Sequence, residues 1–314
     1  MPNKLPKQFI TSAKKCNLDT ALMQQAGIPH VYVESHRILS VQKNPDLRLS
    51  VTSSAEGVHL KLVVKKGAKI KKPIFLCFGV LGQKEKQIIL PEIILEEGAE
   101  AKILAHCTFP QAKNVLHQMD AHIKLGKNSK LIYRENHYHG ESFGAEVLAN
   151  FDIQIGVAAT FENEFVLDQG SVGKLKINLE TRLAQDAFCF INSKVIGKGK
   201  KDKIEISDKV SLLEENARSL VRLRGAVMNG GSMFFKGETE AFAKNNRGHI
   251  DCQEIIVGHS LAQSIPIILV KHPEARITHE ASVGKVNQKQ LETLMAHGLS
   301  EKEAIDFIIR GVIK

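Results

Sequence analysis

The chain has 314 residues, of which 43% are hydrophobic and 25% charged, and its formal net charge is +9. This length and hydrophobic content allow a full core, as one elongated domain or two compact ones, and argue against disorder. With no Trp, three Tyr and lysines scattered through expected turns, the chain lacks the aromatic platform and the basic stripe typical of nucleic-acid binding, so we expect no nucleic-acid partner.

The cysteines are five in number and widely separated, and no two of them form a C-x-x-C pair. This pattern does not indicate a disulfide framework. The first residues are polar and lack the apolar stretch of a signal peptide, and no apolar run approaches the ~18 residues of a membrane span. We therefore expect a cytoplasmic protein without a membrane segment, in which free thiols are either buried or chemically used.

Three segments are expected along the chain. Residues 1–30 form a short N-terminal helical segment, with a helix near 19–25 that ends at Gly27. Residues 31–286 alternate apolar and polar side chains in the manner of β-strands. Helical spacing returns in residues 287–314.

The long β segment repeats a strand–turn–strand unit. Turn glycines at Gly98, Gly126 and Gly156 are about 30 residues apart, as in stacked coils that bury their faces against their neighbours. The pattern predicts an all-β fold with a helical C-terminus, namely a parallel or mixed β-helix capped by the C-terminal helices. Two stacked β-sandwich domains are the alternative.

The C-terminal segment predicts two helices. Leu291 and Leu294 share an apolar face of the first, and Ser300 and Glu303 form a capping box at the start of the second. This hairpin either packs on the solenoid or, because it leaves Phe307 near the chain end exposed, docks a partner.

Two strand-like segments, 248–254 and 276–282, carry the most unusual side chains, and one solenoid turn would place them side by side. They contain Cys252, His279 and Glu280. A lone Cys in a strand is usually a buried hydrophobe, but an unpaired buried carboxylate is expensive, so Glu280 must be solvated, paired or ligating. Thiolates suit iron, zinc or copper and hold most iron–sulfur clusters. Because one chain offers a single thiol here, we expect a site shared by two copies.

A second group of candidates surrounds Cys107. His137 and His139 share one face of an expected strand and are either a metal pair or ordinary hydrogen-bonding groups near a turn. No nucleotide-binding loop is present in the sequence, so any ATP chemistry belongs to another chain.

The chain resembles the SufB/SufD family, the scaffolds of Suf iron–sulfur cluster assembly. The resemblance is carried by residues 248–252, Pro266, residues 278–281 and the pattern over residues 290–311, and it extends more weakly upstream.

The resemblance implies a right-handed parallel β-helix whose C-terminal helices dock an ABC-type ATPase, SufC. It implies a transient iron–sulfur cluster and iron as cargo, assembled at Cys252, Glu280 and His279. Sulfur would enter and travel along Cys107, His137 and His139. The docking residues would be Leu291, Leu294, Ala304, Phe307 and Ile308.

The chain is far shorter than the classical SufB and resembles compact members of the family that are thought to work as homodimers. We therefore expect a homodimer, with a sulfur donor protein as a possible further partner. We expect a scaffold and not an enzyme. Two alternatives stay open from the sequence, a SufD-like structural subunit without its own cluster and a mononuclear His/Cys metal protein. A β-helical enzyme acting on polysaccharide is disfavoured by the absence of Trp.

Overall fold

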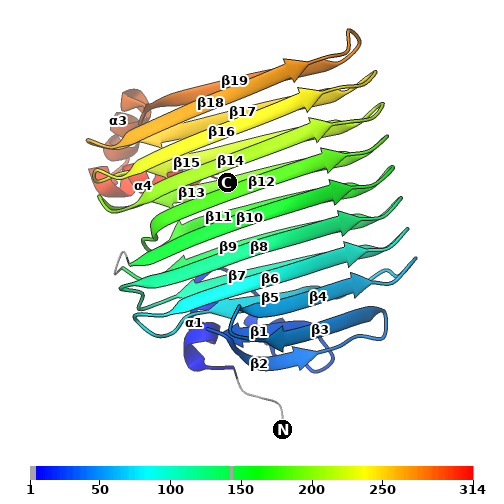
Figure 1. The fold of residues 1–314 in the computed structure, drawn as a ribbon. Coiled ribbons are helices and arrows are strands. Elements are labelled where there is room, and N and C mark those ends of the chain that lie inside the picture. Colours follow the sequence, from blue (N-terminus) through cyan, green and yellow to red (C-terminus); the bar gives the residue numbers. More distant parts are fainter. Residues whose placement is uncertain (1–4, 142–143, 314) are drawn as a thin grey trace.

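The computed structural model describes residues 5–141 and 144–313 and shows a β-solenoid of about eight turns with helices near both termini (Figure 1). Two sheets face each other across a narrow interior. The first sheet contains, in spatial order, β2 (Arg37–Gln42), β1 (His30–Glu34), β5 (Ile74–Gly79), β7 (Glu100–Phe109), β9 (Lys130–His139), β11 (Thr160–Gln169), β13 (Phe188–Gly197), β15 (Arg218–Val227), β17 (Arg247–Ile256) and β19 (Arg276–Lys285). The second contains β3 (Leu47–Ser53), β4 (Val58–Val64), β6 (Lys86–Leu95), β8 (Val115–Leu125), β10 (Ala145–Ile155), β12 (Gly173–Leu183), β14 (Lys203–Leu212), β16 (Ser232–Ala241) and β18 (Leu261–Val270).

Each solenoid turn contributes one strand to each sheet. From β5 and β6 onward neighbouring strands are parallel, and β10 pairs with β12 without a register shift, from Ala145 opposite Gly173 to Ile155 opposite Leu183. Antiparallel pairs occur between β1 and β2 and between β3 and β4, at the N-terminal end. The predicted β-solenoid is therefore confirmed, and the alternative of two β-sandwiches is wrong.

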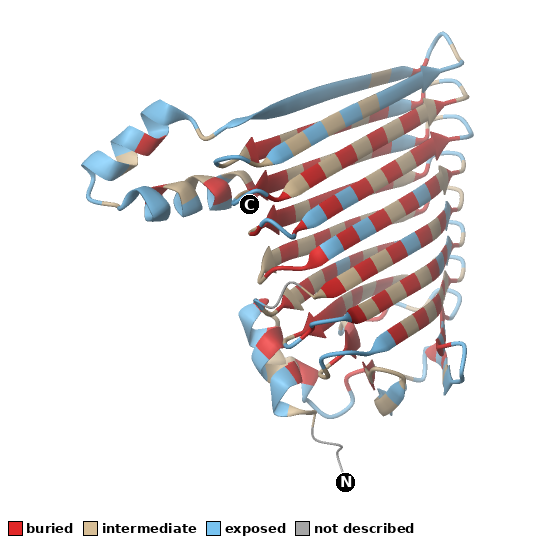
Figure 2. Cartoon of the chain, turned by 60° about the vertical axis from the view of Figure 1, so that its left-hand side comes forward, coloured by how far each residue is buried: buried red, intermediate tan, exposed pale blue. Residues whose placement is uncertain are grey.

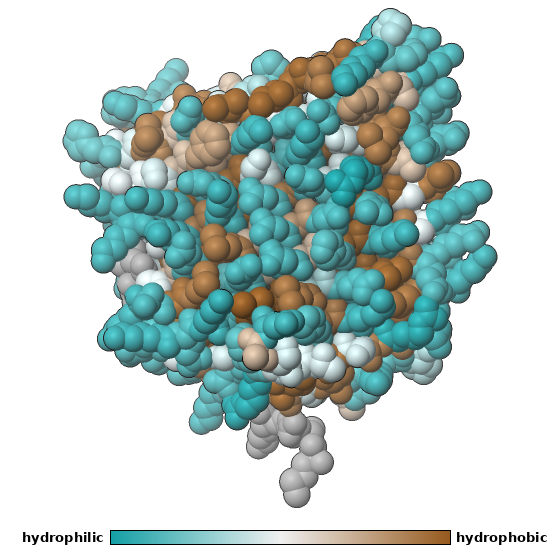
Figure 3. All heavy atoms as spheres, viewed as in Figure 1, coloured by the Kyte–Doolittle hydropathy of each residue, from teal (hydrophilic) through white to brown (hydrophobic). Residues whose placement is uncertain are grey.

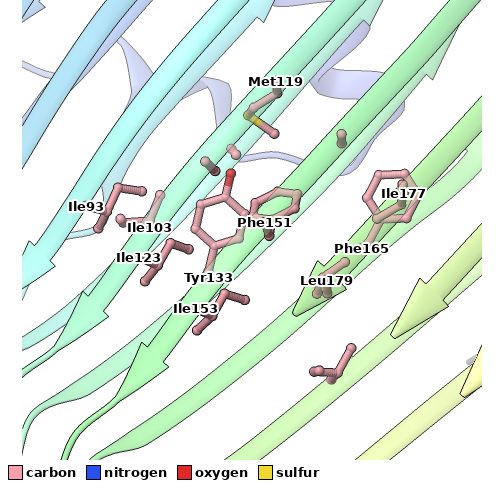
Figure 4. Packing of buried hydrophobic residues seen from close by; sticks show 14 of the residues in the cluster. Ile93, Ile103, Met119, Ile123, Tyr133, Phe151, Ile153, Phe165, Ile177 and Leu179 are labelled. Atoms are coloured by element: carbon pink, nitrogen blue, oxygen red, sulfur yellow. The ribbon is translucent and has the colours of Figure 1, made fainter. Parts of the chain in front are cut away.

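Like side chains stack along the interior because the register repeats from turn to turn. Ile93, Ile123 and Ile153 occupy one register position of β6, β8 and β10, and all three are buried (Figure 4). Tyr133 and Phe151 face each other from opposite sheets, with ring centroids 6.1 Å apart. Burying each such side chain contributes about 1.5–3 kcal/mol, which makes the alternating pattern the main source of stability.

The N-terminal segment packs on the outside of the first sheet. Helix α1 (Lys7–Lys15) and helix α2 (Thr20–Met23) bury Phe9, Ala13 and Met23 against Tyr32 and Cys77. The helix expected near residues 19–25 is α2, capped by the Asp19 carboxylate, whereas α1 was not predicted. Residues 1–4 and 314 of the predicted terminal segments lie outside the described part of the chain.

The C-terminal end of the solenoid is uncovered. Strands β18 and β19 are the last of each sheet, and most of their residues are exposed (Figure 2). Helices α3 (Gln288–Ala296) and α4 (Glu301–Ile313) lie beside the solenoid, where Ile309 and Ile313 pack against β13, β15 and β17. They do not cover the end, which differs from the expected cap. The predicted capping box is confirmed, since Ser300 N donates to the Glu303 carboxylate and Glu303 N to Ser300 Oγ.

None of the helices within the described residues is long and apolar enough to cross a membrane.

The interior also contains isolated polar groups. Asp208 on β14 is fully buried, and neither carboxylate oxygen has a hydrogen-bond partner among the described residues. Burial raises the pKa of Asp208 from 3.8 to about 7. The folded state therefore binds this proton more tightly than the unfolded chain does, and the stability linked to it is lost as the pH rises from about 4 to about 7.

We expect Asp208→Asn, which cannot ionise, to be more stable than the wild type at pH 8 and similar to it near pH 4. The difference in the free energy of unfolding should grow across this window to roughly 4 kcal/mol at most. Denaturant unfolding at several pH values measures it. Asp202→Asn is the matched control, because the Asp202 carboxylate is also buried but accepts hydrogen bonds from the backbone N–H of Gly173, Lys198 and Gly199. Its substitution should destabilise the protein at pH 8. An Asp208→Asn variant that is less stable than the wild type at pH 8 would contradict this account.

Candidate functional site

Strands β17 and β19 lie side by side and pair in parallel, as expected for two segments one solenoid turn apart. Cys252 lies opposite Ala281, Asp251 opposite Glu280, and Ile250 opposite His279. The segments that carry the thiol, the imidazole and the carboxylate are therefore neighbours at the uncovered end (Figure 1).

The three predicted ligands do not share one face. Cys252 and Ile250 point into the solenoid, and His279 takes the same face by register. Glu280 is next in sequence and therefore projects from the outer face, beside Asp251. Cys252 is only 2% exposed, whereas His279 and Glu280 are both exposed. One chain thus brings Cys252 and His279 to one side of the sheet and leaves Glu280 on the other.

The Cys252 thiol lies in a buried, acidic environment. Burial, followed by the carboxylates of Glu254, Asp208 and Asp251, raises the pKa of Cys252 to about 12, and the Ser264 hydroxyl acts in the opposite direction. Glu254 is itself buried, and burial raises its pKa to about 7. At neutral pH in this conformation Cys252 is therefore a protonated thiol, which is neither a strong nucleophile nor a metal ligand.

The outer face beside Glu280 is fixed by ion pairs. The Asp251 carboxylate binds the guanidinium of Arg224, with Arg222 Nε 3.5 Å from the same oxygen. His249 Nδ1 lies 2.8 Å from Thr278 Oγ1, which links β17 to β19. Of the polar residues that flank Cys252, Asp251 therefore lies on the outer face in ion pairs with arginines, whereas Glu254 is buried on the inner face.

A second cluster lies inside the solenoid around Cys107, far from the uncovered end. Cys107, Glu135 and His137 offer a sulfur, an oxygen and a nitrogen that lie within 4.8 Å of one another. Cys107 Sγ is 3.6 Å from Glu135 Oε1 and 3.8 Å from His117 Nε2, and His137 Nε2 is 2.7 Å from Glu135 Oε1. All four side chains are buried.

The predicted residues Cys107, His137 and His139 are all in this interior, and the predicted pair His137 and His139 stacks with ring centroids 5.7 Å apart. Glu135 and His117 were not predicted. A signal for His117 exists, since the other inward positions of β8 are apolar, and Glu135 shares its inward face with the two predicted histidines of β9.

Glu135 of the inner cluster and Cys252 at the uncovered end occupy the same register position of the first sheet, but no open channel joins them. Glu135, Phe165, Ser193, Leu223 and Cys252 follow one another on successive strands of the first sheet. Four strand spacings place the ends about 19 Å apart. A cavity of about 10 Å³ touches Glu135 and Ser193 but does not reach Cys252.

The two C-terminal helices project from the side of the solenoid (Figure 2). Between them lies a groove of about 770 Å³ whose lining includes Leu294, Phe307 and Ile308. Phe307 is 63% exposed. Leu291 and Ala304, also predicted for docking, are buried and do not line the groove.

Comparisons with known proteins agree with these features. A family model described as SUF system FeS cluster assembly, SufBD core domain, matches residues 82–312. The chain is 39% identical to an iron–sulfur cluster assembly SufBD family protein of Methanocaldococcus jannaschii over 285 residues, which are 91% of this chain and 90% of the relative. It is 29% identical to one of Pyrococcus horikoshii over 300 residues (96% and 91%), and 25% identical to one of Staphylococcus aureus over 312 residues (94% and 63%). The chain therefore belongs to the SufBD family of iron–sulfur cluster assembly proteins.

Proposed function

We propose that this protein is a scaffold on which an iron–sulfur cluster is built as cargo between two copies of the chain, under the control of an ABC-type ATPase of the SufC kind. The observation that carries the proposal is the position of Cys252, one strand from an uncovered apolar end of the solenoid.

The uncovered end supports pairing with a second copy. Its exposed apolar side chains are Leu261, Ile265, Ile267, Ile268, Leu269 and Val270 on β18 and Val283 on β19. Apolar atoms gather along the same edge of the molecule in Figure 3. A monomer rarely exposes such a patch, and terminal strands of a solenoid need a partner for their unpaired backbone groups. A twofold pair would cover both ends with the same surface.

Pairing would also complete the ligand set. Each copy contributes one thiol, one imidazole and one carboxylate, from Cys252, His279 and Glu280. Two copies would offer two thiolates, two imidazoles and two carboxylates, from which the four protein ligands of an iron–sulfur cluster could be taken, whereas one chain offers a single thiolate here. The chain itself would perform no turnover and would only bind iron and sulfide and release the cluster.

The helix packing suggests how an ATPase would act on the site. On one side of α4, Ile309 and Ile313 pack in the same cluster as Ile255, three residues beyond Cys252 on β17. Phe307 on the same helix is free for a partner. A force applied to α4 would therefore reach β17 through direct contacts, and loosening β17 would hydrate the Cys252 thiol and lower its pKa.

Sulfur would travel from Cys107 past His137 and His139 toward Cys252. Phe165 and Leu223 occupy the register position that leads from Glu135 to Cys252, so this transfer would need a more open conformation than the one described. A sulfur donor protein is a further expected partner. The expected compartment is the cytoplasm, where all five thiols would stay reduced.

Cys252→Ala should abolish cluster formation because it removes the ligand that each copy contributes. Anaerobic reconstitution of the full chain with iron and sulfide, followed by visible absorption and by iron and sulfide analysis, measures this. Cys189→Ala is the matched control, since Cys189 is equally buried but lies in β13, away from the uncovered end. Undiminished cluster content in Cys252→Ala would reject the scaffold role and favour a SufD-like structural subunit.

Phe307→Asp should weaken binding of the cognate ABC-type ATPase at least about tenfold, which corresponds to about 1.4 kcal/mol, because it places a charge in the apolar groove. Isothermal titration calorimetry measures the affinity. Met295→Asp is the control, since Met295 is exposed on the same hairpin but does not line the groove. Equal affinities of the two variants would argue against docking at this groove.

A further inference from the structure

We propose that Cys107, His117, Glu135 and His137 together bind one divalent transition-metal ion inside the solenoid, at a site separate from the cluster-assembly end. The four side chains come from three neighbouring strands, β7, β8 and β9. The inference does not rest on the proposed cluster site, because it uses none of Cys252, His279 and Glu280, although Cys107 and His137 also belong to the proposed sulfur route.

Three of the donor atoms, those of Cys107, Glu135 and His137, lie within 4.8 Å of one another, and His117 approaches this group through Cys107. Ligands about 2.0–2.3 Å from a metal at tetrahedral angles lie about 3.3–3.8 Å apart. Cys107 Sγ is 3.6 Å from Glu135 Oε1 and 3.8 Å from His117 Nε2. The remaining contact, His137 Nε2 to Glu135 Oε1 at 2.7 Å, is a hydrogen bond that would widen slightly when a metal replaces the shared proton.

The groups behind the donors orient them as in known metal sites. Gln87 donates its amide hydrogens to the carbonyls of Ser35 and Gly79. Its Oε1 is therefore the acceptor of a hydrogen bond from His117 Nδ1, at 2.8 Å. This hydrogen bond fixes the tautomer in which His117 Nε2 carries a lone pair, directed at Cys107. Burial, and secondarily His137, lowers the pKa of His117 to about 3, which keeps the ring neutral.

The carboxylate is held in the same way. Tyr133 donates its hydroxyl to Glu135 Oε2 at 3.2 Å, which leaves Oε1 facing Cys107 and His137. His137 Nδ1 has no hydrogen-bond partner among the described residues, so this ring is oriented by Glu135 and by its ring contacts with His139 and Phe165.

The charges balance with a metal bound. A divalent cation, one thiolate, one carboxylate and two neutral imidazoles sum to zero, which the buried interior requires. Binding would release the proton of the Cys107 thiol, because the thiolate is the form that binds a metal. Without a metal the thiol stays protonated, because burial and the Glu135 charge hold the pKa of Cys107 well above its usual value.

A small cavity and a separate surface pocket lie close to the proposed ligands, although Cys107 lines neither of them. The cavity of about 10 Å³ touches His117, Glu135 and His137 and is about the size that one water or ion occupies. His139 stacks on His137 and also lines a surface pocket of about 490 Å³ beside Lys15 and Tyr138. One sulfur, two nitrogens and one oxygen suit Zn²⁺ or Fe²⁺, whereas Mg²⁺ and Ca²⁺ prefer oxygen ligands.

The test is an anaerobic Co²⁺ titration of the full chain carrying Cys252→Ser, which disables the cluster site. We expect one Co²⁺ per chain, with the thiolate-to-cobalt charge-transfer band and the strong visible bands of tetrahedral cobalt. Excess Zn²⁺ or Fe²⁺ should remove these bands by displacing Co²⁺, and excess Mg²⁺ should leave them unchanged. Cys107→Ser should lose the charge-transfer band.

Two further variants keep the test independent of folding defects. Glu135→Gln and His117→Gln should weaken Co²⁺ binding at least about tenfold, by analogy with the 10- to 100-fold losses from outer-shell changes alone. The matched control is His122→Gln, because His122 lies on the same strand β8 as His117 but projects outward and is exposed. Circular dichroism without metal verifies that each variant is folded.

Absence of the cobalt–thiolate band in the Cys252→Ser chain would overturn the proposal, and so would an unchanged band in Cys107→Ser or unchanged affinity in both Gln variants. None of these cobalt measurements depends on the result of cluster reconstitution, in which Cys252→Ala is compared with the wild-type chain.

Discussion

The structure depends on the unbroken parallel hydrogen bonding between successive turns. Because each strand from β7 to β17 has its backbone partners on the turns before and after it, a side chain at one inward position stacks on its equivalent one turn away. This register makes Ile93, Ile123 and Ile153 a continuous apolar column, and it equally places Cys107 beside His137 and Cys252 beside Ala281. It also leaves the final strands β18 and β19 with a neighbouring strand on one side only. The proposed site therefore lies at an end that a second copy would cover.

The fold was largely predictable because it rests on periodicity. The turn glycines about 30 residues apart and the alternating strands predicted the solenoid, and the same alternation placed His137 and His139 on one face. The site was less predictable, since it depends on which strands face each other. Glu135 and His117 come from opposite sheets, and only the coiling of the chain brings both to Cys107. The opposite faces of His279 and Glu280 on β19, by contrast, follow from their adjacency in the sequence once residues 276–285 are assigned to a strand.

Cys107 and Cys252 lie in one interior but in different surroundings. Cys107 lies deep in the solenoid beside two imidazoles and a carboxylate, whereas Cys252 lies near the uncovered end beside the buried carboxyls of Glu254 and Asp208. Burial keeps both thiols protonated, so each needs a further event to become a ligand. For Cys107 that event is the arrival of a cation among preset donors. For Cys252 it is a change at the subunit interface, which α4 is positioned to transmit.

Native mass spectrometry of the full-length, anaerobically reconstituted protein tests the central claim, a cluster held between two copies, most directly. The account predicts a species with the mass of two chains plus one iron–sulfur cluster in the reconstituted sample, and no such species in a sample without iron and sulfide. A cluster carried by a single chain, or one cluster on each chain of a dimer, would contradict the account.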